Sequence, residues 1–172
     1  VTTSARAPRF LAKSTLFSMP FVGWFVRGSG AIPVYRRQDA GADITRNREM
    51  FAAVDDALER GECVCLFPEG TTHSTGRLEP LKSGAARIII GAEGRGLRVA
   101  IVPVGLNLDR KAVWRSTATV AYGRPFWADE VPVDAADRVD ALTELMADRL
   151  RDVMIEASPV GEHELVARID RI

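Results

Sequence analysis

Apolar residues along this chain occur either in short continuous runs or at helical spacing, and the two patterns alternate. The short runs predict five strands, at residues 9–13, 31–35, 63–67, 99–106 and 117–122. The third and fourth runs are continuously apolar. We therefore expect these two strands to be buried on both faces, as strands of a parallel sheet are.

Apolar residues three or four positions apart predict three helices, at residues 50–61, 83–94 and 134–157. Ser83 and Asp134 are expected to cap the second and third helix, because their side-chain oxygens can accept a hydrogen bond from the first turn. Strands that alternate with helices predict an α/β fold, with a mostly parallel central sheet flanked by helices.

The 23 basic and 23 acidic residues balance in number but are unevenly distributed. Residues 1–40 contain six basic side chains and one acid, whereas residues 129–172 contain twelve acids and five arginines. We divide the chain into an α/β domain over residues 1–128 and an acidic, helical C-terminal extension of the same domain over residues 129–172. The basic first part indicates an anionic partner, either a phosphate or a membrane surface, and a solvated face explains it equally well.

The two cysteines, Cys63 and Cys65, lie two positions apart in one predicted strand and so point to the same face. This spacing is poor for a disulfide between them, and two thiols are too few for a zinc site. We expect both to pack in the core and expect no metal site. The sequence contains no run of 18 uncharged apolar residues, so no membrane-spanning helix is expected.

Polar side chains follow two of the predicted strands. Arg36 and Arg37 follow the second strand, and the third leads into a loop that contains Glu69, Gly70, Thr71 and Thr72. In open α/β sheets, ligands bind beyond the carboxyl ends of the strands. Lys82 comes just before the second helix, whose free N–H groups favour an anion.

These positions predict a phosphate cradle, because guanidinium groups grip phosphate and a glycine allows close backbone approach. A second interpretation is equally open from the residues alone. Arg36 and Glu69 would then form a structural ion pair across neighbouring strands, and the loop would be a plain turn.

Three segments carry a resemblance to a known family: "GAIPVYR" at 30–36, "FPEGT" at 67–71 and "VPVGL" at 102–106. In that order and spacing they resemble the glycerolipid acyltransferase family, which includes the 1-acylglycerol-3-phosphate and glycerol-3-phosphate acyltransferases. The similarity extends over about residues 10–126, and "LKSGAARI" at 81–88 also resembles the family.

The resemblance implies an enzyme of phospholipid synthesis that transfers a fatty acyl group from acyl-CoA or acyl carrier protein. The acceptor would be a hydroxyl of glycerol phosphate or lysophosphatidate. No metal, no bound cofactor and no nucleic-acid partner are implied. By match, Arg36 and the Glu69-Gly70-Thr71 loop would bind the acceptor's phosphate and glycerol end. Thr72 stands where many members have Arg, so Arg37 or Lys82 would supply part of the compensating charge, and Pro103 and Val104 would be structural or line the acyl path.

The family's catalytic base is a His followed, after four other residues, by Asp, and it lies upstream of the first segment. This chain has two histidines, His73 and His163, and the residues five positions later are Leu78 and Arg168. Neither pair fits, so we expect the base upstream of Val1, with the N-terminal part of the domain missing and this chain alone inactive. His73 is the weaker candidate base, and a non-catalytic phosphate- or lipid-binding module derived from such an enzyme is the alternative function.

The segment at residues 17–26 is rich in aromatic side chains and is flanked by Lys13 and Arg27. It would suit a face that lies on a membrane, with aromatic rings in the interface and cations at the headgroups. A core helix under the sheet is the equally open alternative. Pro20 and Gly23 argue against a long regular helix in either case. A lipid-synthesising member is expected at the cytoplasmic face of a membrane, peripheral or monotopic.

Overall fold

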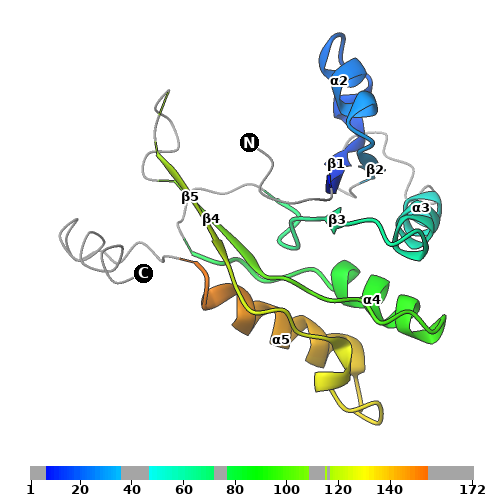
Figure 1. Ribbon diagram of the computed structural model, residues 1–172, viewed down its shortest axis with the longest axis vertical. Coiled ribbons are helices and arrows are strands. Elements are labelled where there is room, and N and C mark those ends of the chain that lie inside the picture. Colours follow the sequence, from blue (N-terminus) through cyan, green and yellow to red (C-terminus); the bar gives the residue numbers. More distant parts are fainter. Residues whose placement is uncertain (1–6, 36–46, 72–76, 109–114, 116, 155–172) are drawn as a thin grey trace.

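The computed structural model describes residues 7–35, 47–71, 77–108, 115 and 117–154 (Figure 1). Five of the residues singled out in the sequence lie outside this part of the chain: Arg36, Arg37, Thr72, His73 and His163. Within the described residues the elements follow one another as strands and helices, and the expected α/β fold is confirmed.

A parallel sheet forms the first part of the fold. It contains β1 (Arg9–Lys13), β2 (Ile32–Val34) and β3 (Val64–Cys65), in the spatial order β2-β1-β3. Leu11 of β1 lies opposite Ile32 of β2, and Phe10 lies opposite Cys65 of β3. The first strand of the sequence is therefore the central one.

The last two strands, β4 (Val104–Leu108) and β5 (Ala118–Tyr122), form a separate antiparallel pair. The expectation of a fourth strand from residue 99 that is buried on both faces is wrong. β4 begins at Val104, and its residues alternate between exposed Val104 and Leu106 and buried Gly105. The reason is that, among the described residues, β4 pairs with β5 alone and is covered on the face where Gly105 lies against the backbone of Val153.

The third expected strand is also shorter and less buried than the sequence indicates. Only Val64 and Cys65 pair, and the Phe67 side chain is 61% exposed because the chain turns away at Pro68. Core packing of both thiols is wrong as well, since Cys63 is exposed and Cys65 is half-buried. Cys63 precedes the paired part of β3, which lies at an edge of its sheet. Partial burial raises the pKa of the Cys65 thiol.

The described residues form two apolar cores, and α4 contributes to both. α3 (Asn47–Glu59) packs Met50 and Val54 against Ile32 of β2, and α4 (Gly84–Gly94) adds Ile88 to the same core. The opposite side of α4 belongs to the second core with α5 (Arg138–Arg151) and the 3₁₀ turn η2 (Ala128–Glu130). Members of this second core that are almost completely buried are Ala86, Phe126 and Leu142. α4 thus holds the two halves of the molecule together (Figure 1).

The helix caps differ from the sequence prediction. Ser83 precedes α4 but makes no side-chain cap bond, because its own backbone is already helical (φ −67°, ψ −1°). The cap of α5 is Asp137, whose carboxylate accepts the N–H of Asp140 at 3.1 Å. Asp134 is kept out of the helix by the preceding turn, in which the Ala135 N–H donates to the Pro132 carbonyl. The helix is shorter at its other end too, at Arg151 instead of residue 157.

The aromatic segment forms two short helices, α1 (Ser14–Phe17) and α2 (Val22–Gly28), which make a hairpin that projects from the sheet (Figure 1). Its placement as a core helix is wrong, because Gly23 is its sole buried residue. Among the described residues, no helix has the length and apolar character to cross a bilayer.

Candidate functional site

The three parallel strands all end on the same side of the sheet, which we call its carboxyl edge. β1 ends there at Lys13, β2 continues to Tyr35, and β3 leads into the loop at residues 67–71. The expectation that the strands before Arg36 and Glu69 are neighbours is wrong, because β1 lies between them. Two strand spacings separate the exits by about 10 Å. A direct Arg36–Glu69 ion pair would therefore have to reach past the end of the central strand at Lys13.

The end of β2 is held by a side chain that the sequence did not single out. Asn47, the first residue of α3, accepts the Tyr35 N–H through Oδ1 at 3.2 Å and donates through Nδ2 to the Tyr35 carbonyl at 3.0 Å. These two hydrogen bonds to Tyr35 fix the backbone immediately before Arg36. Arg36 and Arg37 themselves lie outside the described residues, so their role stays a prediction.

The loop after β3 is a four-residue turn. The Gly70 N–H donates to the Phe67 carbonyl at 3.1 Å, and Gly70 has φ +69°, a backbone conformation that favours glycine. Pro68 occupies the second position, where its fixed φ suits a turn. The geometry of the turn explains why Pro68 and Gly70 stand at their positions. It does not require a glutamate at position 69.

Lys82 lies directly against this turn. Its N–H donates to the Pro68 carbonyl at 2.8 Å, and a Cβ added to Gly70 would lie 3.4 Å from Lys82 Cγ. The lysine stem therefore covers the glycine, its exposed side chain remains beside the loop, and α4 begins two residues later. The structure thus brings Gly70 and Lys82 together, and their binding of a phosphate stays a prediction.

Glu69 is half-buried and helps to close the loop. Its Oε2 accepts the N–H of Glu79 at 3.1 Å. At least one oxygen of the carboxylate is thus used to fold the segment that returns to Lys82. The sequence gives no signal for this contact, because the donor is a backbone group that any residue would supply. Whether Glu69 also orients Arg36 or binds a hydroxyl stays a prediction.

The electrostatic character of this edge is mixed. Glu69 and Glu79 bring carboxylates, whereas Lys82 and Lys13 bring ammonium groups, and Thr71 ends the described part of the loop with an exposed hydroxyl. Among the described residues, Lys82, Lys13 and the N–H groups that open α4 are the groups here that would favour an anion. Among the residues with described positions, no cluster of three or more His, Cys, Asp or Glu could hold a metal ion.

Comparison with known families identifies the family to which the chain belongs. Residues 1–107 match the family model described as acyltransferase, which covers more than half of the chain and includes the loop and Lys82. The chain belongs to the acyltransferase family. The family assignment made from the "FPEGT" and flanking segments is therefore confirmed.

Several characterised acyltransferases are similar to the chain. Glycerol-3-phosphate O-acyltransferase 2 of Saccharomyces cerevisiae is 39% identical over 85 residues, which are 48% of this chain and 11% of that protein. The chloroplastic 1-acyl-sn-glycerol-3-phosphate acyltransferase BAT2 of Brassica napus is 32% identical over 57% of this chain and 26% of its own length. The 1-acyl-sn-glycerol-3-phosphate acyltransferase of Bacillus subtilis is 26% identical over 84% of this chain and 67% of its own length. The chain thus spans about a tenth of the yeast protein and a quarter of the plant one.

Proposed function

We propose that this protein is an O-acyltransferase of phospholipid synthesis, which acylates a hydroxyl of glycerol phosphate or lysophosphatidate. The observation that carries the proposal is the contact of Lys82 with the Gly70 turn at the carboxyl edge of the parallel sheet. Family membership and the names of the similar proteins support the reaction type and the kind of acceptor.

In the proposed reaction, the acceptor's phosphate binds between the exits of β2 and β3. Lys82, the N–H groups at the start of α4 and Arg36 or Arg37 provide its positive surroundings. Glu69 does not attract the phosphate, since like charges repel. Because its carboxylate already accepts the Glu79 N–H, Glu69 keeps the loop in the shape that leaves Lys82 beside Gly70.

The acceptor's hydroxyl oxygen attacks the thioester carbonyl carbon of acyl-CoA or acyl-acyl carrier protein. The C–S bond breaks, the thiolate leaves, and a base takes the hydroxyl proton. Neither His73 nor His163 has the His–four residues–Asp spacing of the family's base. We propose that such a pair upstream of this segment is the base, that no metal or bound cofactor takes part, and that the reaction occurs at the cytoplasmic face of a membrane.

The test measures thiol release by the full-length natural protein with acyl-CoA and either lysophosphatidate or the corresponding monoacylglycerol, which has no phosphate. Lys82→Ala should raise the KM for lysophosphatidate by about 10- to 100-fold, because a lost bond to a charged group costs roughly 1.5–3 kcal/mol. The KM for monoacylglycerol should not change. Arg124→Ala removes an exposed cation outside the loop and serves as the matched control.

Two results would overturn the proposal. An unchanged KM for lysophosphatidate in Lys82→Ala would remove Lys82 from the acceptor site. Binding of lysophosphatidate without any thiol release would support the alternative, a lipid- or phosphate-binding module without catalytic activity.

A further inference from the structure

We propose that the α1–α2 hairpin is a docking element that places its aromatic tip in the interfacial region of an anionic lipid bilayer. The tip is defined by Phe21, Trp24 and Phe25, whose side chains are 91%, 82% and 70% exposed. Phe21 is the N-cap of α2, and Trp24 and Phe25 lie in its first turn, so the three exposed rings gather at the N-terminal end of this helix. This is a concentrated apolar surface, whereas scattered single exposed apolar residues need no explanation.

The hairpin is built as a rigid unit instead of a loose loop. Gly23 is buried against α1, and a Cβ added there would lie 2.9 Å from the carbonyl carbon of Phe17 and closer still to its oxygen. Arg27 donates to the same Phe17 carbonyl at 3.0 Å. Two contacts between α1 and α2 thus converge on one backbone group. The hairpin keeps its shape while its tip remains outside the fold.

Phe21 occupies a backbone conformation that an L-residue rarely adopts. Its φ is +62° and its ψ is −51°, and the Val22 N–H donates to the Pro20 carbonyl at 2.7 Å. This is a γ-turn of the strained kind, at which glycine would be the favourable residue. A phenylalanine placed there with 91% of its side chain exposed gains no packing in return. Strain without an internal benefit indicates an external role for that ring.

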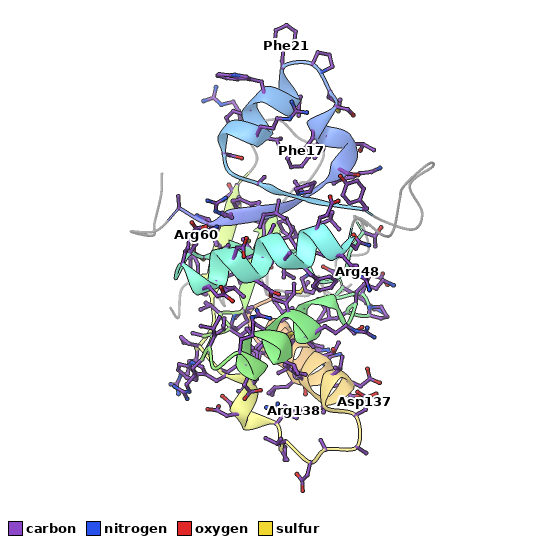
Figure 2. All side chains as sticks on the ribbon, turned by 90° about the vertical axis from the view of Figure 1, so that its right-hand side faces the viewer. Phe17, Phe21, Arg48, Arg60, Asp137 and Arg138 are labelled. Atoms are coloured by element: carbon purple, nitrogen blue, oxygen red, sulfur yellow. The ribbon has the colours of Figure 1, made fainter. Side chains whose placement is uncertain are left out.

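Charge and shape favour a lipid surface as the occupant. The hairpin itself, residues 14–28, contains Arg27 and no acidic residue, and Lys13 immediately precedes it. Arg27, in the last turn of α2, is exposed behind the aromatic tip, which is the order of groups found in interfacial helices. Figure 2 shows Phe21 projecting outward at one end of the long axis of the molecule, whereas Phe17 lies nearer the sheet. Because the tip projects, it can enter a bilayer while the rest of the protein stays outside the bilayer.

The position of the hairpin connects it to the candidate site. α1 begins immediately after Lys13, at the same sheet edge from which the loop at residues 67–71 emerges. If the tip is in a bilayer, the hairpin therefore brings that bilayer close to the end of β1, which lies between the ends of β2 and β3. This geometry would let a lipid acceptor reach the edge of the sheet without crossing the protein core.

The test is flotation of the full-length protein with vesicles of phosphatidylcholine alone and of phosphatidylcholine mixed with phosphatidylglycerol, without any substrate. Phe21→Ser, Trp24→Ser and Phe25→Ser together should lower the vesicle partition coefficient by about tenfold or more, because the rings no longer leave water. The matched control is Val120→Ser with Val133→Ser, which removes exposed apolar side chains elsewhere. Phe21→Gly should also reduce partitioning while leaving Tm unchanged or higher, since glycine relieves the turn.

A local measurement keeps the proposal testable if another segment of the protein also binds lipid. Vesicles should shield Trp24 from aqueous quenchers, and that fluorescence change should vanish in Trp24→Phe. An identical signal with and without vesicles would overturn the proposal. So would shielding of Trp24 before vesicles are added, because another segment, a second copy or a protein partner would then cover the tip. Neither result depends on whether the proposed acyl transfer is correct.

Discussion

The α1–α2 hairpin and α5 each contain a cluster of large apolar side chains, which is exposed in the hairpin and buried in α5. Phe21, Trp24 and Phe25 in the hairpin are at least 70% exposed. In α5, Leu142 and Met146 are four positions apart; Leu142 is fully buried and Met146 is 6% exposed. Apolar residues that lie close together at a helix therefore do not show by themselves whether the fold covers them.

The polar residues around the two clusters explain the difference. Two arginines of α5 connect it to its surroundings: Arg138 pairs with Glu93 of α4 at 2.6 Å, and Arg149 pairs with Glu130 of η2 at 2.8 Å. The hairpin has a cation but no acid. The ion pairs to α4 and η2 help to hold α5 over its core. A hairpin tip with Arg27 and no acid of its own suits an anionic surface.

The largest expected effect is a loss of stability when an apolar side chain is shortened in α5 and not in the hairpin. Leu142→Ala should lower the free energy of unfolding by about 2–5 kcal/mol, because it leaves a cavity between α4 and α5. Phe25→Ala, the matched change in the hairpin, should alter it by less than about 0.5 kcal/mol. Urea denaturation followed by circular dichroism measures both. Equal losses in the two variants would contradict the contrast, since Phe25 would then have packing partners.

The next effect concerns how the hairpin is held together. Gly23→Ala should destabilise the protein by roughly 1–3 kcal/mol, because the new methyl group meets the Phe17 backbone and cannot be accommodated by a side-chain movement. Gly28→Ala is the matched control in the same helix. No atom lies within 4 Å of a Cβ there, so it should be neutral or stabilise by up to about 1 kcal/mol. The measurement is the difference in Tm between these two variants, and a hairpin that moves freely would show none.

Local chemistry in the sequence was enough to predict the fold class and part of the candidate site. Pro68 and Gly70 indicate a turn, and the turn with its downstream lysine indicates the loop that the structure closes with Lys82. Family resemblance rested on the same residues. These features are predictable because each depends on the backbone preferences of a few adjacent residues.

Features that depend on distant partners could not be predicted. The order β2-β1-β3 is decided by which strands pair, and no residue in "CVCLF" reveals that only two of its members do. Asn47 reaches Tyr35 across twelve positions, and the Glu69 carboxylate accepts a backbone N–H that any residue at position 79 would offer. The cap of α5 shifted from Asp134 to Asp137 because a turn at Pro132 came first.

The smallest expected effect tests how the hairpin is anchored where it returns to the sheet. Arg9 donates to the Gly30 carbonyl at 3.4 Å and to Glu62 Oε1 at 3.2 Å, so one guanidinium joins the end of the hairpin to the chain before β3. Hydrogen bonds from Arg60, and after it from Arg9, lower the pKa of Glu62 below its usual value of 4.5. A carboxylate with a lowered folded pKa stabilises the protein above its unfolded pKa, and that contribution disappears as pH falls through the folded value.

Glu62→Gln should therefore lower Tm slightly at neutral pH, and the difference from wild type should shrink as the pH is taken below about 4.5. Glu144→Gln, which removes an exposed carboxylate from α5, is the control for the loss of one surface charge. The effect is small because Glu62 is in contact with water, which screens the ion pair. A Tm difference that stays constant down to about pH 3 would show that Glu62 acts through its shape and not through its charge. The anchor of the hairpin would then rest on the Arg9–Gly30 bond, and the contrast with the ion-paired α5 would be stronger.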